Sequence, residues 1–348
     1  MSAWEEGVVF TAQAGAEQCA RNELQRTGLR MADVRWLDAG VGWAAAEGGF
    51  ARLAAVFAQE LPIFIRHICP AQVCVPHGGQ AEVPALLAEA AWDAFGAHID
   101  RSRRFSVQAV FLREGDTPYK RFDVHSAIAG VFAEHGATLD VTRPEQVISV
   151  THLPDRAYLG LSEAADNLSD WAGGAHRFAH EAGQISRAEF KLLEAIEVFR
   201  LRLPAQGTAL DLGAAPGGWT RVLRAQGLAV VAVDPAALDE RVAADPGVTH
   251  FRGTAQKYLQ DPAMADIIVN DMRMDARESA HIMGSVAACL REGGLAVMTL
   301  KLPQQGMQRQ AAQAMALLRR WYDVAGARQL FHNRAEITVV LRPKGAAQ

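Results

Sequence analysis

Hydrophobic positions in the second half of the chain alternate regularly between short apolar runs and longer amphipathic stretches. The runs typical of strands lie at residues 208–213, 228–234, 248–251, 265–271, 294–300, 327–332 and 336–342. Stretches of helical period separate most of them, which predicts a parallel sheet covered on both faces, an α/β fold of the Rossmann-like type. Because only residues 333–335 lie between the last two runs, we expect an antiparallel hairpin at one edge.

The first half of the chain has a less regular pattern. Strand-like runs at 7–11 and 41–45 alternate with helical stretches at 16–27 and 50–60. Strands and helices of similar number, without the steady alternation of the second half, predict a small α+β unit over residues 1–75.

A second α+β unit is predicted over residues 76–162, and a change of composition follows it. The runs 146–152 and 157–161 flank a polar turn, which is typical of a hairpin. Residues 163–185 contain several glycines and show no helical face, so they predict a linker. The last domain is then expected over residues 186–348.

Composition and charge set limits on the kind of protein. Of the 348 residues, 50% are hydrophobic and 21% charged, which is typical of globular domains. The net charge of -4 gives no overall sign of nucleic-acid binding, although a local basic strip remains compatible with it. The 4 cysteines form no CxxC pair, which argues against zinc and disulfides. We see no signal peptide or membrane-spanning run, and expect a cytoplasmic protein with no membrane partner and no required metal.

The strongest local motif is the segment DLGAAPGGW at 211–219, which closes a strand and opens a helix. Gly213, Gly217 and Gly218 let the backbone approach a ligand without a Cβ clash. Pro216 fixes the backbone between them. The helix N-terminus offers free N–H groups, and ligands of doubly wound sheets bind outside the carboxyl ends of the strands. We therefore expect a cofactor at this loop.

An acidic residue at the end of the next strand indicates a cofactor with a ribose. From that position the carboxylate of Asp234 can accept both ribose hydroxyls of an adenosine. This pairing alone does not separate S-adenosyl-L-methionine from a dinucleotide. The lack of a GxGxxG spacing and the proline within the loop favour S-adenosyl-L-methionine.

The predicted topology places four ionisable residues at the same edge of the sheet: Lys191, Asp271, Lys301 and Glu336. The chain has 35 Lys+Arg but only five lysines, so a pair of lysines at this edge indicates a specific chemical need. Arginine stays protonated, whereas a partly buried lysine beside a second cation can lose its proton and act as a base. We expect the two carboxylates to position these groups.

The tetrad order Lys191, Asp271, Lys301, Glu336 around this loop resembles the FtsJ/RrmJ-like ribose 2'-O-methyltransferases and their K-D-K-E tetrad. The resemblance implies that Lys301 takes the proton of a ribose hydroxyl while the other three complete the tetrad. It also implies a site for S-adenosyl-L-methionine, lined by Ser186, Gly213, Ala215, Pro216, Gly217, Gly218, Trp219, Asp234, Thr254 and Asp271. The family tends to carry an acid where this chain has Thr254, so the adenine contacts are expected to differ.

Further similarity narrows the expected substrate. Segments that resemble the bacterial members acting on a cytidine ribose of 23S ribosomal RNA lie at 186–195, 300–303, 327–339, 145–150 and 158–161. The resemblance implies a ferredoxin-like domain at 1–75 and a THUMP-like, RNA-binding domain at 76–162. It implies 23S ribosomal RNA as the substrate, and we expect a monomer or a weak homo-oligomer.

Cationic and aromatic side chains are the candidates for RNA contact: Arg101, Arg103, Arg104, Lys120, Arg121, Trp171, His176, Arg177, Arg187, Arg309, Arg319 and Arg320. Another RNA such as tRNA remains an alternative substrate, because THUMP-like domains occur in several RNA-modifying enzymes. A protein that kept the fold and lost the chemistry is a second alternative. A nicotinamide-dependent oxidoreductase is disfavoured by the loop spacing.

Overall fold

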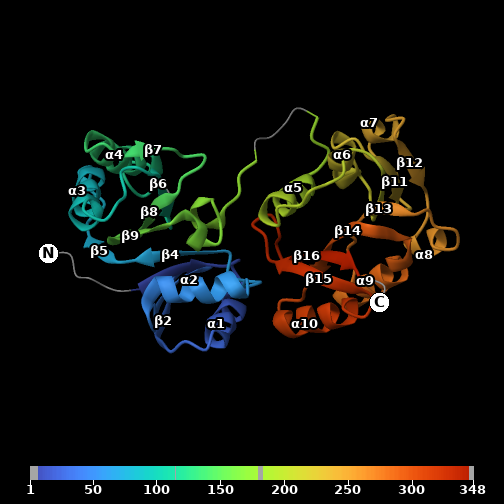
Figure 1. The fold of residues 1–348 in the computed structure, drawn as a ribbon, viewed down its shortest axis with the longest axis horizontal. Coiled ribbons are helices and arrows are strands. Elements are labelled where there is room, and N and C mark those ends of the chain that lie inside the picture. Colours follow the sequence, from blue (N-terminus) through green and yellow to red (C-terminus); the bar gives the residue numbers. More distant parts are fainter. Residues whose placement is uncertain (1–6, 114, 179–182, 345–348) are drawn as a thin grey trace. The chain divides into compact units, whose positions relative to one another are not determined.

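The computed structural model describes residues 7–113, 115–178 and 183–344 (Figure 1). The chain divides into two compact units, Met1–Ala175 and His176–Gln348. This division falls inside the segment 163–185 predicted as a linker, of which residues 179–182 lie outside the described residues. In the part of the chain that is described, no helix is both long and apolar enough to cross a bilayer.

The first sheet of the N-terminal unit is antiparallel, with the strand order β2-β3-β1-β4. Its strands are β1 (Gly7–Thr11), β2 (Met31–Asp38), β3 (Val41–Ala46) and β4 (His67–Ala71), and its helices are α1 (Glu17–Arg26) and α2 (Gly49–Gln59). Phe10 of β1 packs against Leu24 and Leu53 of the two helices. This βαββαβ order is compatible with the predicted ferredoxin-like unit.

The second sheet of this unit has the order β5-β9-β8-β6-β7. Its elements are β5 (Val73–Pro76), α3 (Val83–Phe95), β6 (Arg104–Phe111), α4 (Arg121–Glu134), β7 (Thr138–Leu139), β8 (Gln146–His152) and β9 (Arg156–Glu163). Strands β8 and β9 form the expected antiparallel hairpin. Helices α3 and α4 cover one face around Phe105 and Phe132. The assignment of this part as THUMP-like stays a prediction.

The beginning of the expected linker folds onto the N-terminal unit. Two short 3-10 helices, η1 (Ala164–Asn167) and η2 (Ala172–Gly174), follow β9. The Thr11 hydroxyl donates a hydrogen bond of 2.8 Å to the Gly173 carbonyl. The Gln108 amide donates one of 2.8 Å to the Asp170 carbonyl. The glycines of this segment therefore belong to irregular backbone that packs against the N-terminal unit, at least up to Gly174.

The C-terminal unit contains a seven-stranded sheet with the order β12-β11-β10-β13-β14-β16-β15. Its strands are β10 (Thr208–Leu212), β11 (Ala229–Val233), β12 (Val248–Phe251), β13 (Ala265–Asn270), β14 (Leu290–Lys301), β15 (Tyr322–Arg328) and β16 (Glu336–Pro343). Strands β10 to β14 are parallel, and β16 runs antiparallel between β14 and β15. The predicted α/β class, with a mostly parallel sheet and an antiparallel hairpin, is confirmed.

Within this sheet, one strand was predicted at the wrong position. The strand expected at 327–332 lies earlier, as β15, and residues 329–335 form the loop before β16. Strand β15 is at the edge of the sheet and has one neighbour, so its residues need a less continuous apolar run. The buried strand of the hairpin is β16, which brings Glu336 beside Lys301 in the strand register.

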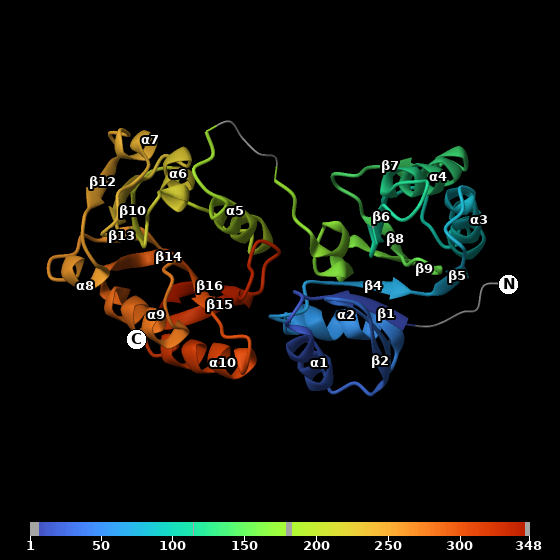
Figure 2. The same ribbon diagram turned by 180° about the vertical axis from the view of Figure 1, so that it is seen from behind.

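Helices cover both faces of the seven-stranded sheet, as the two opposite views show (Figures 1 and 2). They are α5 (Glu189–Val198), α6 (Gly218–Ala225), α7 (Glu240–Ala243), α8 (Ala255–Tyr258), α9 (Ala276–Ser285), η3 (Ala287–Cys289) and α10 (Met307–Leu318). Helices α5 and α6 pack on one face through Leu192 and Leu223. On the other face, Tyr322 of β15 donates a hydrogen bond of 2.7 Å to the Met283 carbonyl of α9.

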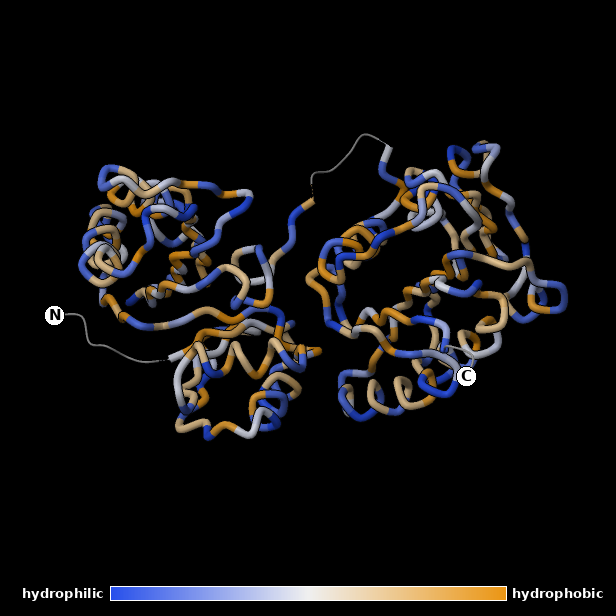
Figure 3. Tube along the Cα trace, viewed as in Figure 1, coloured by the Kyte–Doolittle hydropathy of each residue, from blue (hydrophilic) through white to orange (hydrophobic). Residues whose placement is uncertain are grey.

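The amphipathic pattern of these helices explains their placement. Along α10, hydrophilic and hydrophobic residues are interspersed in Figure 3. Its buried positions, Met307, Ala311, Ala314, Met315 and Leu318, recur at helical spacing. The apolar stripe of α10 is buried, and the polar side of the helix faces water. The helices cover the faces of the sheet, so polar groups at the carboxyl ends of the strands remain accessible.

Candidate functional site

The loop between β10 and α6 has the backbone geometry that its glycines permit. Gly213 and Gly217 have φ values of 76° and 113°, in the left-handed region that L side chains avoid. A Cβ on Gly213 would lie 3.2 Å from the Cα of Met272, which follows Asp271. A Cβ on Gly218 would collide with the Ser186 hydroxyl. The loop thus passes close to both Ser186 and Asp271, two residues predicted to line the same cofactor site.

Asp234 lies beside this loop, as the sequence indicates. Its carboxylate accepts hydrogen bonds from the backbone N–H groups of Ala215, at 3.1 Å, and Ala236, at 2.8 Å. A carboxylate has about four lone-pair positions, so two remain for the hydroxyls of a ribose. Asp234 is also only half-buried. Free acceptor capacity next to a glycine-rich helix N-terminus fits the adenosine part of S-adenosyl-L-methionine.

Two other residues predicted to line the cofactor site, Trp219 and Thr254, make contacts within the protein. The Trp219 ring is buried, and its indole N–H donates a hydrogen bond of 2.7 Å to the Ala188 carbonyl. The ring thereby ties α6 to the residue before α5. Thr254 is exposed, and its hydroxyl caps α8 by accepting from the Lys257 N–H at 3.4 Å.

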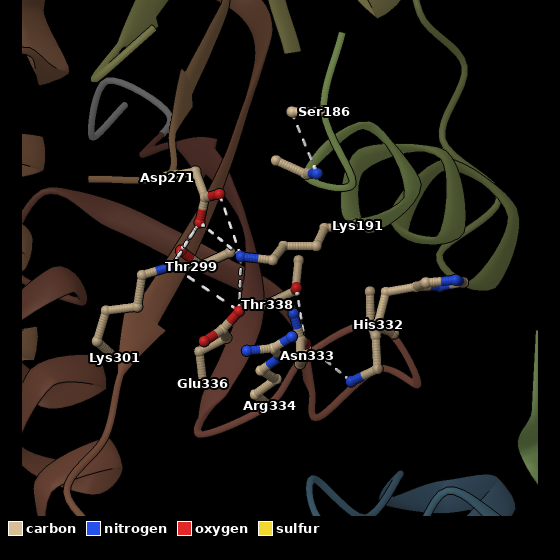
Figure 4. A network of polar contacts seen from close by, with 12 residues as sticks. Ser186, Lys191, Asp271, Thr299, Lys301, His332, Asn333, Arg334, Glu336 and Thr338 are labelled. Atoms are coloured by element: carbon tan, nitrogen blue, oxygen red, sulfur yellow. Dashed lines mark hydrogen bonds and ion pairs between the residues drawn. The ribbon is translucent and has the colours of Figure 1, made fainter. Parts of the chain in front are cut away.

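The four predicted tetrad residues lie together at the carboxyl edge of the sheet (Figure 4). The Lys191 Nζ lies 3.2 Å from Asp271 Oδ2 and 2.6 Å from Glu336 Oε1. The Lys301 Nζ lies 2.5 Å from Asp271 Oδ1 and 3.9 Å from Glu336 Oε1. All four side chains are at most 22% exposed. Two cations and two anions thus form one largely buried cluster. Helix α5 contributes Lys191, β14 and β16 contribute Lys301 and Glu336, and Asp271 follows β13.

The two lysines of the cluster differ in their pKa. Burial lowers the pKa of Lys301 below its usual value, and the charge of Lys191 adds to this effect, against the attraction of Asp271 and Glu336. Burial also acts to lower the pKa of Lys191, but Asp271 and Glu336 outweigh it and the pKa is raised. For Asp271, burial opposes ionisation, yet the two ammonium groups hold its pKa below the usual range. Lys301 is thus the lysine that more readily becomes neutral.

A buried threonine joins this cluster, and the sequence reasoning missed it. Thr299 is fully buried on β14. Its hydroxyl donates a hydrogen bond of 2.6 Å to Asp271 Oδ1 and accepts one of 2.8 Å from the Lys301 Nζ. The signal that could have found it is a polar residue in the otherwise apolar run Ala296–Leu300, two positions before Lys301 and so on the same face.

Two buried glutamates on α5 hold neighbouring backbone segments, and neither was among the predicted site residues. Glu189 accepts hydrogen bonds from the backbone N–H groups of Ile185 and Ser186 and pairs with Arg221 at 2.6 Å. Glu194 accepts from the backbone N–H groups of Phe331 and His332 at 2.6 and 2.8 Å. The first glutamate holds the entry to the cofactor loop and the second holds the loop before Glu336. In the sequence, charged residues on a helix such as these are not distinguished from solvated charges.

Several candidates for RNA contact are already engaged within the protein. The Arg103 guanidinium pairs with Glu163 at 2.5 Å, and Arg104 pairs with Asp140 and Glu145 at 3.4 Å. His176 is buried and lies 3.3 Å from Glu197. These three side chains are therefore poor candidates for binding phosphates. Lys120, Arg177, Arg187 and Arg309 are exposed.

Fold and site together define a class. A seven-stranded sheet of this order carries a glycine-rich loop after its interior strand β10 and an acid after the neighbouring strand β11, which is a Rossmann-like cofactor-binding domain. The proline-containing loop and the Lys–Asp–Lys–Glu cluster beside it are features of S-adenosyl-L-methionine-dependent methyltransferases. Within the described residues, no group of three or more His, Cys, Asp and Glu side chains is placed to hold a metal ion.

Comparison with known proteins agrees with this class. Residues 184–314 match the family described as FtsJ-like methyltransferase. The C-terminal unit therefore contains an FtsJ-like methyltransferase domain, whose cofactor is S-adenosyl-L-methionine. The matched range includes Ser186, Lys191, the cofactor loop, Asp271 and Lys301 and ends before Glu336.

The curated relatives that match this chain include ribosomal RNA large subunit methyltransferases M. The protein from Psychromonas ingrahamii is 32% identical over 200 residues, 53% of this chain and 54% of the relative. The protein from Halorhodospira halophila is 37% identical over 177 residues, 49% of this chain and 51% of the relative. The chain thus spans about half the length of the curated relatives it matches. A crystal structure of TrmN from Thermus thermophilus is a distant likeness, with a TM-score of 0.40 and 16% identity over 97% of this chain and 99% of that one.

Proposed function

We propose that this chain transfers a methyl group from S-adenosyl-L-methionine to the 2'-hydroxyl of a ribose in 23S ribosomal RNA, the ribose of a cytidine. The observation that carries the proposal is the cluster of Lys191, Asp271, Lys301 and Glu336 beside the cofactor loop. A methyltransferase acting on a hydroxyl needs a base for the departing proton, and the cluster contains a lysine whose pKa is lowered.

Lys301 is the base in this proposal. Bound S-adenosyl-L-methionine supplies the methyl group on its sulfonium, so that the new oxygen–carbon bond forms as the sulfur–carbon bond breaks and its electron pair stays on sulfur. The hydroxyl proton passes to the lone pair of the neutral Lys301 Nζ, which becomes an ammonium. Asp271, 2.5 Å away, then stabilises that new positive charge.

Lys191 and Glu336 have supporting roles. The Lys191 ammonium lies 2.6 Å from Glu336 and keeps its proton because its pKa is raised. Its fixed charge favours the neutral form of Lys301. Glu336 balances the charge of Lys191, so that Asp271 is shared between the two lysines. The cofactor itself would be held by Ser186, Asp234 and the backbone of residues 213–218.

The assignment of ribosomal RNA rests on the relatives, which are named ribosomal RNA large subunit methyltransferase M. In this proposal the N-terminal unit binds the RNA, with a ferredoxin-like domain at 1–75, a THUMP-like domain at 76–162 and the linker at 163–185. The protein acts as a monomer or weak homo-oligomer, and a ribosomal RNA substrate would place it in the cytoplasm.

The deciding experiment is transfer of tritium from labelled S-adenosyl-L-methionine to protein-free large-subunit ribosomal RNA from a strain that lacks this gene. We expect about one label per RNA, recovered as a 2'-O-methylated nucleoside after digestion. A parallel sample of tRNA tests the alternative substrate. Label on tRNA alone would overturn the ribosomal assignment, and label on neither RNA would overturn the activity.

Substitution of Lys301 tests the assignment of the base. We expect Lys301→Ala to lower kcat by about 10³-fold, because general-base contributions are of this order. Lys301→Arg should be equally slow, because an arginine keeps the charge and cannot accept the proton. Lys344→Ala, which removes an exposed lysine, is the matched control and should be fully active. Loss of cofactor binding together with activity in Lys301→Ala would show that the residue's role has been misplaced.

A further inference from the structure

Thr299 is a polar residue in a buried apolar run, and its hydroxyl contacts two residues of the charged cluster. It lies on β14 in the run Ala296–Leu300, whose other members are apolar and buried. Its hydroxyl has both of its directions defined, because it donates to Asp271 Oδ1 at 2.6 Å and accepts from the Lys301 Nζ at 2.8 Å (Figure 4). With its hydrogen committed to the carboxylate, the Thr299 oxygen can act towards Lys301 only as an acceptor.

The amine of Lys301 therefore has two close acceptors. Asp271 Oδ1 lies 2.5 Å from the Nζ and Thr299 Oγ1 lies 2.8 Å from it. Glu336 Oε1, at 3.9 Å, is beyond hydrogen-bond distance. A neutral primary amine has two hydrogens and one lone pair. If the hydrogens point at Asp271 and Thr299, the lone pair is left in the remaining direction.

We propose that Thr299 is a positioning residue that, with Asp271, orients the neutral Lys301 amine so that its lone pair meets the substrate hydroxyl. This inference rests on the proposed function of Lys301 as the base. Without Thr299, the amine has one strong acceptor and can rotate about its Cε–Nζ bond. A base that is neutral but wrongly oriented is as ineffective as a protonated one.

The same arrangement suits the amine after it has taken the proton. The hydroxyl proton forms the third N–H bond of the Lys301 ammonium as the ribose oxygen bonds to the methyl group and the sulfur–methyl bond breaks. The two earlier hydrogens stay on Asp271 and Thr299. No hydrogen bond of the cluster has to move during the step, which is the condition for a preorganised site.

The test compares Thr299→Val with Thr299→Ser in the full chain. Valine has nearly the shape of threonine and lacks the hydroxyl, whereas serine keeps it. The matched control is Thr338→Val, because Thr338 is equally buried and lies opposite Thr299 on β16. Its hydroxyl donates instead to Asn333 Oδ1 at 3.0 Å. The readouts are kcat against pH, KM for RNA, the Kd of S-adenosyl-L-methionine and the melting temperature.

We expect Thr299→Val to lower the high-pH plateau of kcat by about 10- to 100-fold, the order found when a reacting group is misplaced. The plateau is the decisive part of the profile, because Lys301 is neutral there in every variant. Thr299→Ser should restore most of the rate, and Thr338→Val should keep it. If Thr299→Val reaches the full high-pH plateau of kcat and shifts only the midpoint of the pH profile, the orienting role would be overturned. So would equal losses in Thr299→Val and Thr338→Val.

A spectroscopic measurement separates this inference from the proposed function. Lysine labelled with ¹³C at Cε gives few signals in a chain with five lysines, and Lys301→Arg identifies that of Lys301. We expect Thr299→Val, and not Thr338→Val, to shift the Lys301 signal. An unshifted signal would overturn the contact itself. A shifted signal in a protein that methylates no RNA would overturn the function and uphold the contact.

Discussion

Each unit contains a cluster in which two basic side chains meet carboxylates, and the two clusters differ in their basic residue and in burial. In the C-terminal unit, Lys191 and Lys301 meet Asp271 and Glu336 with side chains 10–22% exposed. In the N-terminal unit, Arg103 and Arg104 meet Asp140, Glu145 and Glu163 with side chains 28–50% exposed. In both clusters, two basic side chains contact two or three acidic side chains.

The difference between these clusters shows what makes a charge network chemically useful. The arginines stay charged under all ordinary conditions, and water screens their exposed ion pairs. The lysines can change their protonation state, and burial combined with unequal distances to the carboxylates separates their pKa values. The number of charges is therefore a poor guide to function, and the decisive properties are the residue type and its exposure.

Among the predictions that test this comparison, we expect the largest change, in the pH dependence of kcat, for Lys191→Met. The Lys191 ammonium lowers the pKa of Lys301, so its removal should raise that pKa. Lys301 would then be protonated over a wider pH range, and kcat at neutral pH should fall about tenfold for each unit of the rise. The measurement is kcat against pH, with Lys344→Met as the control. A midpoint that stays in place or moves down would show that the two lysines do not interact.

A smaller effect, on stability, is expected for Glu194→Ala. This carboxylate is buried like those of the tetrad, yet backbone N–H groups of Phe331 and His332 and the ring of His332 surround it in place of ammonium groups. Removal leaves these groups unsatisfied and should lower the free energy of unfolding of the C-terminal unit by about 3 kcal/mol. Denaturant unfolding followed in that unit measures it. Glu194→Gln, which keeps an acceptor, should lose less, and equal losses would contradict the hydrogen-bond explanation.

The smallest effect is expected for Arg103→Gln. Its ion pairs with Glu145 and Glu163 are exposed, so their removal should leave the melting temperature unchanged within error. RNA affinity should also be kept, because these carboxylates already occupy the guanidinium. Melting and filter-binding measurements at low and moderate salt test both points. A large loss of RNA affinity would show that Arg103 exchanges its carboxylates for phosphates and would remove the contrast between the two clusters.

The sequence allowed the central sheet and the tetrad to be predicted because both depend on burial patterns and strand ends. Interior strands such as β13 are continuous apolar runs, and Asp271 and Lys301 follow from where such runs stop. Edge strands were harder to predict. Strands β2, β4, β5 and β15 were missed or misplaced, and each lies at the edge of its sheet. An edge strand has one hydrogen-bonded neighbour and tolerates charges and prolines, so its pattern is weak.

Side-chain roles within the site could be predicted only in part. A glycine-rich loop predicts where the backbone can approach a ligand, and Gly213 and Gly217 adopt left-handed φ values that favour glycine. It does not predict where the large side chain of Trp219 points, because that depends on packing against α5. Thr299 and Glu194 were missed for the same reason. The acid that accepts from Thr299 and the backbone that donates to Glu194 lie far away in the sequence, and only the tertiary structure brings them together.

The antiparallel insertion of β16 has a consequence for the order in which the site is made. Ribosomes synthesise a chain from its N-terminus, so the cofactor loop after β10 emerges well before Glu336 at the beginning of β16. Until β16 pairs with β14, Lys191 lacks the carboxylate that lies 2.6 Å from it in the folded unit. A nascent or truncated chain that ends before β16 would thus have the loop for the methyl donor and an unfinished charge cluster. If the cluster acts as proposed, the chain would become able to catalyse methyl transfer only after β16 has been synthesised and paired.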